Sequence, residues 1–198
     1  MRTNILIAIV CLAGSRLGHT QGTVNFANAG AGINAPVYVG FLTGPLASTG
    51  WMAQLVLDTG GGSLTAVGSP ASFIGSAAPG YFNGGVVTVS QVAPGALGTF
   101  QIFAWDSATG VNSYAAALAA WSAGVIHGGY SGSVTITTGG AGSPPSVPAS
   151  LVGLQPWGGA TIPEVSTTLL GFLGAGALLL WRTAASKKEY SLTERPRT

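Results

Sequence analysis

Short apolar runs separated by glycine and proline restrict the fold of this chain more than any other feature. The runs are rich in β-branched and aromatic residues and are four to nine residues long. Runs of this kind, recurring at short intervals, predict a mainly β fold, here a Gly-rich antiparallel β-sandwich of the jelly-roll or Ig-like kind. The predicted strands cover residues 23–26, 36–40, 51–58, 63–68, 85–92, 98–106 and 133–138.

The run at 98–106 predicts a strand buried on both faces. Phe100, Ile102 and Ala104 alternate with Gln101, Phe103 and Trp105, so apolar side chains point to both sides. Such a strand is expected in the centre of a sheet or beneath a covering loop. The segment between Val92 and Thr99 reads as the connection of an antiparallel pair.

One segment, residues 112–124, predicts a helix instead of a strand. It is rich in alanine, Asn112 or Ser113 can cap its start, and Gly124 can end it. Tyr114, Leu118 and Trp121 recur at helical spacing. We therefore expect one short Ala-rich helix whose shared face packs on a sheet.

Charge is concentrated at the two ends of the 198-residue chain, and only 6% of residues are charged. All seven Lys and Arg residues lie before Gln21 or after Glu164, and the only charged residues between these two positions are Asp58 and Asp106. A nucleic-acid-binding surface needs Lys or Arg to neutralise phosphates. The composition of the middle region therefore excludes nucleic acid as a partner.

The first 21 residues read as a secretory signal peptide. Arg2 precedes an apolar run from Ile5 to Ala13, which is too short to span a bilayer. Cys11, the only cysteine, lies inside this run, so the exported chain would have no thiol. A buried N-terminal strand or a retained anchor is the alternative.

A second apolar segment, Val165 to Trp181, predicts a single C-terminal transmembrane helix. It has no charge and would span about 25 Å as a helix, close to the thickness of a bilayer core. Trp181 is suited to the membrane interface, and Arg182, Lys187 and Lys188 follow it. The positive-inside rule places the basic tail, residues 183–198, in the cytoplasm and the preceding domain outside.

The stretch "IPEVSTTLLGFLGAGALLLWR", within residues 161–182, resembles the PEP-CTERM sorting signal of exported bacterial proteins. Pro163 and Glu164 match the first two positions of the motif, Ser166 and Thr167 match the residues that often follow, and Arg182 begins the basic cluster. Val165 stands where a second proline is usual. The resemblance implies that an exosortase, a membrane-embedded processing enzyme, recognises this signal.

The remainder of the chain resembles exported PEP-CTERM proteins of the Verrucomicrobia type, on stretches such as "GTVNFANAG" and "FQIFAWD". That resemblance implies no assigned activity. We predict a β-sandwich passenger at residues 22–140 and a Gly/Pro-rich linker at 141–160. Because "LVGLQPW" could dock on the domain, the passenger core could end either near residue 140 or near residue 158. The implied destination, after passage across the inner membrane and transient or permanent anchoring, is the cell surface or extracellular matrix.

Groups that could carry catalysis are few. His127 could form a Ser-His-Asp set with a serine and either Asp58 or Asp106, but no Gly-x-Ser-x-Gly elbow holds a serine. Each aspartate follows a strand and precedes glycine, which is typical of turn chemistry; the alternative is a pair of Ca²⁺ ligands, although calcium prefers more carboxylates. We therefore expect no catalytic residue, no metal site and no cofactor.

Aromatic residues are numerous for so uncharged a region and allow a second interpretation. Trp51 and Trp105 are candidates for stacking on sugar rings of an exopolysaccharide if they are exposed, whereas core packing is the usual role of such rings. The sequence therefore predicts a non-catalytic envelope or matrix protein, with a carbohydrate-binding module as the alternative.

Overall fold

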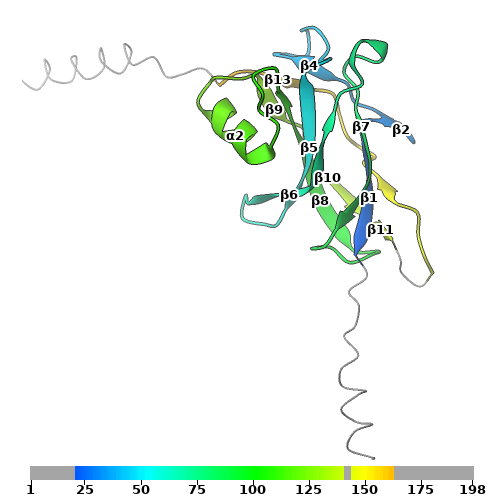
Figure 1. Cartoon of the computed structure of the whole chain (residues 1–198). Helices are drawn as coiled ribbons and strands as arrows, with labels where there is room; N and C mark the ends of the chain where they lie inside the picture. The colour runs from blue at the N-terminus through cyan, green and yellow to red at the C-terminus, as the bar shows by residue number, and fades with distance from the viewer. Residues whose placement is uncertain (1–20, 141–143, 163–198) are drawn as a thin grey trace, which may run out of the picture. The chain divides into compact units, whose positions relative to one another are not determined.

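The computed structural model describes residues 21–140 and 144–162, which form a mainly β structure with one short α-helix (Figure 1). Each run predicted as a strand forms one, although the strands predicted at 23–26, 63–68, 85–92 and 98–106 extend beyond their predicted bounds. The elements are β1 (Gly22–Ala27), β2 (Ala29–Gly30), β3 (Ile33–Asn34), β4 (Val37–Val39), β5 (Trp51–Asp58), β6 (Leu64–Ser72), the 3-10 helix η1 (Gly75–Ala77), β7 (Asn83–Val89), β8 (Leu97–Asp106), α2 (Tyr114–Ser122), β9 (Gly128–Tyr130), β10 (Val134–Thr137), β11 (Gly139–Gly140), β12 (Ala149–Ser150) and β13 (Trp157–Gly159).

The first sheet is built around β1. Strand β7 pairs with β1 antiparallel, from Gly22 opposite Val89 to Ala27 opposite Asn83. Strand β11 is also antiparallel to β1, whereas β12 is parallel to it. The first strand of the domain is thus held by segments that come much later in the chain.

The second sheet has the order β10-β8-β5-β6, and β9 also pairs with β8. All of its pairs are antiparallel. Strands β5 and β8 are paired along most of their length, from Trp51 opposite Asp106 to Leu57 opposite Phe100. Two smaller pairs complete the domain: β2 with β3, antiparallel, and β4 with β13, parallel.

One hydrophobic core receives side chains from both large sheets. Val24 and Phe26 of β1 belong to the same buried cluster as Leu55 of β5 and Ile102 of β8. These residues are at most 1% exposed. Burial of apolar surface between the sheets is the main stabilising contribution expected for such a domain.

The alternation predicted for residues 98–106 is confirmed. Phe100, Ile102 and Ala104 of β8 face the main core, whereas Phe103 and Trp105 belong to a second buried cluster on the opposite face. Strand β8 lies inside its sheet, with β5 on one side and β9 and β10 on the other. Both faces are apolar because both are covered.

Helix α2 covers the second face, and its prediction is confirmed with one correction. Ser113 is the N-cap, and its hydroxyl accepts a hydrogen bond from the backbone N–H of Ala116. Tyr114 and Trp121 pack against Phe103 as expected. Leu118, predicted to share this face, is only half-buried, and the buried residue between Tyr114 and Trp121 is Ala117. The smaller side chain of Ala117 lets the helix approach the sheet.

The prediction that residues 92–99 connect an antiparallel pair is wrong. Strand β7, before this segment, pairs with β1, whereas β8, after it, pairs with β5 in the other sheet. The connection therefore crosses between sheets. Its turn is held by the hydroxyl of Thr138, which donates to the carbonyl oxygen of Ala93 at 2.7 Å.

The prediction of a linker at residues 141–160 is also wrong for the described part of that segment. Strands β12 and β13 lie within it and pair with β1 and β4. Leu151, Leu154 and Trp157 belong to the main core. The domain therefore continues past residue 158, and the compact unit ends at Ile162, because these apolar residues fill space that the earlier strands leave open.

Several predictions concern residues outside the described ranges. The signal peptide, except for Gln21, the sorting signal from Pro163 onward, the transmembrane segment and the basic tail all lie there. Within residues 21–140 and 144–162, no helix has both the length and the apolarity needed to cross a membrane.

Candidate functional site

The predicted sorting motif directly follows the folded domain. Ile162 is the last described residue, and Pro163 and Glu164 come next in the sequence. The residues predicted to act in sorting and anchoring lie outside the described ranges and stay predictions: Pro163, Glu164, Ser166, Thr167, Trp181, Arg182, Lys187 and Lys188.

The two tryptophans predicted to stack on sugars are buried, which corrects that prediction. Trp51 is 6% exposed and Trp105 is 0% exposed. The indole N–H of Trp105 donates to the carbonyl oxygen of Val111 at 2.7 Å, and the Trp51 ring packs edge-on against Phe73. Neither ring presents a face to solvent, because both serve the core, as large aromatics on sheets commonly do.

An aromatic cluster joins α2 to the outer face of the second sheet. Phe103 lies within 6 Å, centroid to centroid, of Trp105, Tyr114, Trp121 and Tyr130. The hydroxyl oxygens of Tyr114 and Tyr130 are 2.7 Å apart. Burial, and next the hydrogen bond with Tyr114, raise the pKa of Tyr130 above its ordinary value. The sequence pattern predicted the helix but not this hydroxyl pair, because Tyr130 comes from a separate strand.

Asp58 and Asp106 both act in turns. Asp58 accepts a hydrogen bond from the backbone N–H of Gly60 at 2.8 Å, and Asp106 accepts one from Ala108 at 2.9 Å. Asp106 is opposite Trp51, seven residues from Asp58 along β5, so the carboxylates are roughly 23 Å apart along the strand. They cannot share a Ca²⁺ ion. The described residues hold no group of three or more His, Cys, Asp or Glu side chains that could bind a metal.

The hydrogen bond between His127 and Asp106 joins their backbones, not their side chains. The N–H of Asp106 donates to the carbonyl oxygen of His127 at 2.9 Å, whereas the Asp106 carboxylate is engaged by Ala108. The Nδ1 atom of His127 is buried and has no hydrogen-bond partner in the part of the chain that the structure describes. Within the described residues, the Asp106 carboxylate is therefore bonded to the turn and not to the His127 ring.

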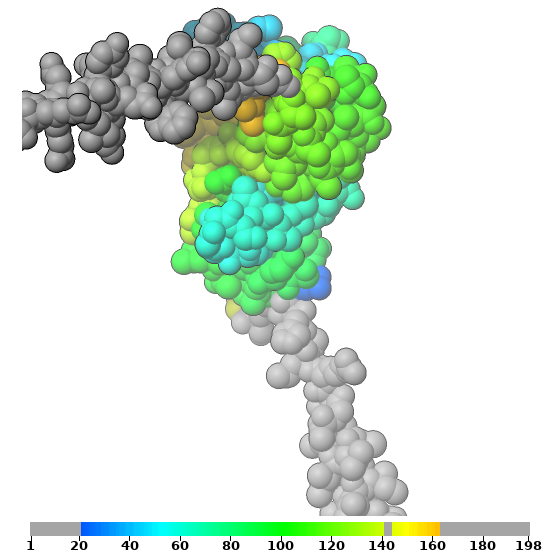
Figure 2. Space-filling view, turned by 90° about the vertical axis from the view of Figure 1, so that its left-hand side faces the viewer, coloured from blue at the N-terminus to red at the C-terminus, as the bar shows by residue number. Residues whose placement is uncertain are grey.

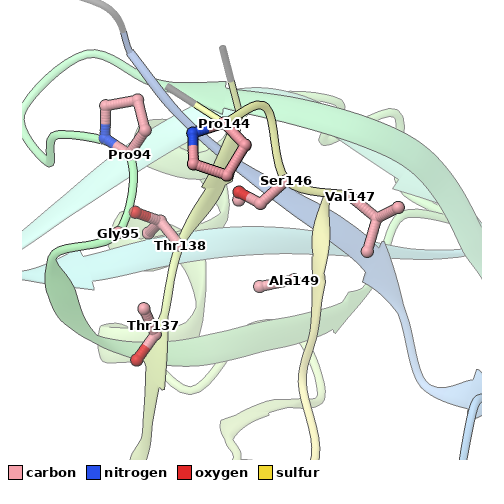
Figure 3. A pocket seen from close by; sticks show the side chains of 9 residues that line it. Pro94, Gly95, Thr137, Thr138, Pro144, Ser146, Val147 and Ala149 are labelled. Atoms are coloured by element: carbon pink, nitrogen blue, oxygen red, sulfur yellow. The ribbon is translucent and has the colours of Figure 1, made fainter. Parts of the chain in front are cut away.

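A shallow hollow of about 420 Å³ lies where β10 and β11 meet the segment before β12 (Figure 3). Its lining contains no charged side chain: Pro94, Gly95, Thr137, Thr138, Gly139, Pro144, Ser146, Val147 and Ala149. The Thr138 hydroxyl is already used in the domain's own turn. Its remaining side-chain polar groups are the hydroxyls of Thr137 and Ser146.

A second hollow, of about 650 Å³, lies between the edge strands β6 and β7 and has an equally neutral lining. Gly68, Ser69 and Pro70 form one wall, and Asn83 and Val86 contribute to the other. Both of these hollows are thus lined by uncharged residues.

Among residues 21–140 and 144–162, the most exposed pair of adjacent apolar residues lies in the loop after β4. Phe41 is 79% exposed and Leu42 is 57% exposed. Neither residue was predicted from the sequence to have a functional role. The signal was present in "GFLTGP", where two adjacent large apolar residues stand between glycines and outside any alternating strand pattern.

No protein-family model, curated protein or solved structure matches this chain. Its function is therefore inferred from the sequence and from the geometry of the described domain.

Proposed function

We propose that this chain is an exported, non-catalytic cell-envelope or extracellular-matrix protein whose C-terminal PEP-CTERM-like signal is processed by an exosortase. The observation that carries the proposal is the position of the domain boundary. The folded unit ends at Ile162, and the next residues are Pro163 and Glu164, followed by the uncharged run from Val165 to Trp181. A processing enzyme in the membrane would meet a complete domain on one side of the motif and a membrane segment on the other.

The charge and chemistry of the described domain support a passenger without enzymatic activity. Its two aspartates are used in turns, and its buried amides, Asn28 and Gln54, donate to backbone carbonyl oxygens of the domain itself. The polar groups therefore maintain the fold. The hollows add no charged residue to this set.

We classify the passenger as a β-sandwich, on the ground that two large sheets share one core. The parallel pairs of β1 with β12 and of β4 with β13 depart from a purely antiparallel jelly-roll or Ig-like pattern. Both parallel pairs are formed by the last described segment. That segment closes the domain immediately before the sorting motif.

The alternative, a carbohydrate-binding module for exopolysaccharide, loses its two proposed stacking residues, because Trp51 and Trp105 are buried. No observation on the described surface favours it.

The decisive experiment follows processing in a host that has an exosortase and in the same host without it. An epitope is inserted between Gly61 and Gly62, because this hairpin tip is exposed and a Cβ added at Gly61 would meet no atom within 4 Å. We expect a smaller, surface-bound or released form only where the exosortase is present. Pro163→Ala/Glu164→Ala should block its appearance, and Val165→Pro, which completes the motif, should increase it.

An unprocessed, membrane-retained chain in both hosts would overturn the proposed processing and leave an ordinary anchor. A matched control, Thr161→Ala, changes a residue just before the motif and should be processed like the original chain.

A further inference from the structure

The loop that carries Phe41 and Leu42 has a defined backbone conformation. The N–H of Gly44 donates to the carbonyl oxygen of Phe41 at 2.8 Å, and the N–H of Val39 donates to the carbonyl oxygen of Pro45 at 2.8 Å. A Cβ at Gly44 would collide with the carbonyl oxygen of Val39, so the close turn requires glycine. Two large apolar side chains are thus presented to solvent by a closed loop, an arrangement that is unfavourable in water and needs a reason.

This loop lies beside the segment by which the chain leaves the domain. The N–H of Gly40 donates to the carbonyl oxygen of Gly159 at 2.7 Å, and a Cβ on Gly158 would lie 3.2 Å from the Cα of Phe41. Figure 1 shows β4 and β13 together at one end of the domain, and β11 at the other. Ile162, itself 39% exposed, follows Gly159 by three residues.

Only Pro163 and Glu164 separate Ile162 from Val165, the first residue of the uncharged run. Three peptide units reach at most about 11 Å. The headgroup layer on each side of a bilayer is about 5–8 Å thick. If Val165 begins a membrane span, Ile162 must therefore lie at or near the headgroup layer.

The charge pattern at this end of the domain is compatible with such a position. Of the two aspartates in the described residues, Asp106 lies at this end of the domain, opposite Trp51. Its carboxylate accepts a hydrogen bond from the backbone N–H of Ala108. No Lys or Arg occurs between Gln21 and Glu164. Contact with lipid would therefore depend on apolar side chains and would not require anionic headgroups.

We propose that Phe41 and Leu42 insert into the headgroup layer of the membrane that holds the C-terminal segment, so that the domain contacts lipid directly. This inference rests on the proposed anchoring. An aromatic and an aliphatic side chain suit this layer, where apolar groups reach the edge of the hydrocarbon core. The loop would thereby fix how the passenger stands on the membrane before processing.

The test uses the full chain with Cys11→Ser, so that an introduced cysteine is the only thiol. Phe41→Cys carries an environment-sensitive fluorophore, and Leu42→Cys is a second reporter in case the first is perturbed. Val147→Cys is the control, because Val147 is 84% exposed and its backbone lies beside Gly139 of β11, at the other end of the domain (Figure 1). The chain is reconstituted into phosphatidylcholine vesicles that contain a headgroup-level quencher lipid.

We expect a blue shift and a loss of fluorescence at positions 41 and 42, and neither change at 147. Vesicle flotation tests the anchoring of the chain separately from the contact of the loop with lipid. A chain that floats while all three positions remain unquenched would overturn the lipid contact and leave the anchoring intact. A chain that does not float would overturn the anchoring and this inference with it. In vesicles without the quencher lipid, the blue shift could depend on protein concentration. If the quencher lipid then causes no loss of fluorescence, the loop contacts a second copy of the chain, and the lipid contact is overturned.

Discussion

Asn28 is fully buried, and both ends of its amide are hydrogen-bonded to the backbone. Its nitrogen donates to the carbonyl oxygens of Ala35 and Gly80 at 2.8 Å each, and its oxygen accepts from the N–H of Phe82 at 2.9 Å. One side chain thus joins the β2–β3 region to the segment that leads into β7. Buried polar groups of this kind are costly to leave without partners.

Asn28→Ala should lower the free energy of unfolding by about 3 kcal/mol, since it removes three hydrogen bonds and leaves the N–H of Phe82 without its acceptor. Urea denaturation followed by tryptophan fluorescence measures the change. Asn83→Ala is the matched control: Asn83 is exposed and accepts one bond from Gly85, so its loss should stay below about 1 kcal/mol. Equal losses in the two variants would contradict the role assigned to Asn28.

The raised pKa of Tyr130 predicts that the stability of the domain falls at alkaline pH. Burial, and then the hydrogen bond with Tyr114, raise its pKa above the ordinary value of 10.0, so the folded chain keeps the phenolic proton after the unfolded chain has lost it. The stabilisation is complete below the ordinary pKa and is lost as the pH rises above it. Urea midpoints measured from about pH 8 to about pH 11 should fall less steeply in Tyr130→Phe than in the original chain.

Tyr38→Phe is the control for this experiment, because Tyr38 lies on β4, outside the aromatic cluster. It should leave the slope above the ordinary tyrosine pKa close to that of the original chain. If Tyr130→Phe follows the same slope as the original chain, the hydroxyl pair does not couple folding to pH.

At the scale of elements, β6 departs most from regular geometry. Ala53 pairs with Ala71 and Leu55 with Val67, so Gly68, Ser69 and Pro70 together lie opposite Gln54 alone. The buried amide of Gln54 donates to the carbonyl oxygen of Val67 at 2.8 Å. This side-chain hydrogen bond gives a partner to a backbone carbonyl at the bulge, where the regular pairing of β5 with β6 is interrupted. Figure 2 shows the face on which the β5–β6 hairpin, in cyan, lies below α2, in green.

Gly68→Ala should cost at least about 1 kcal/mol more than Gly85→Ala. Both glycines have positive φ, +69° and +72°, so both alanines meet the same backbone penalty. Only at Gly68 would the new Cβ lie 2.7 Å from Cγ1 of Val87, a stiff and buried side chain, whereas at Gly85 nothing lies within 4 Å. Thermal denaturation of the two variants measures the difference, and equal losses would show that the contact between β6 and β7 relaxes freely.

At the scale of the whole molecule, the last described segment decides whether the domain is complete. Strands β12 and β13 bring the buried side chains of Leu151, Leu154 and Trp157 to the main core. Each such side chain contributes on the order of 2 kcal/mol, and a domain of this size is stable by only about 5–15 kcal/mol. Loss of the segment would therefore remove much of the net stability.

We expect a chain of residues 21–162 to unfold in one cooperative thermal transition and a chain of residues 21–140 to show none. Circular dichroism in the far and near ultraviolet measures both. Val152→Ser in the longer chain is the control, because Val152 belongs to the same segment but is 58% exposed, and it should leave the transition nearly unchanged. A cooperative transition of the shorter chain at the same temperature would contradict the boundary at Ile162.

The strands of four or more residues and the helix could be located from the sequence alone, whereas the short strands β2, β3, β9, β11, β12 and β13 were not predicted. Short apolar runs between glycines and prolines located β5 and β8, and Ser113 followed by alanines located α2, because these signals depend on residues that are neighbours in the chain. The turn roles of Asp58 and Asp106 were predictable for the same reason, since each carboxylate bonds an amide two residues away.

Tertiary structure alone decided which strands pair and which aromatic rings are hidden. Sequence could not show that residues 92–99 connect two sheets, that β12 lies parallel to β1, or that Trp51 and Trp105 are buried. Each depends on segments far apart in the chain competing for one core, and local propensity contains no information about that competition. The end of the domain at Ile162 was decided in the same way, because a Gly- and Pro-rich segment becomes ordered once its few large apolar side chains find a space to fill.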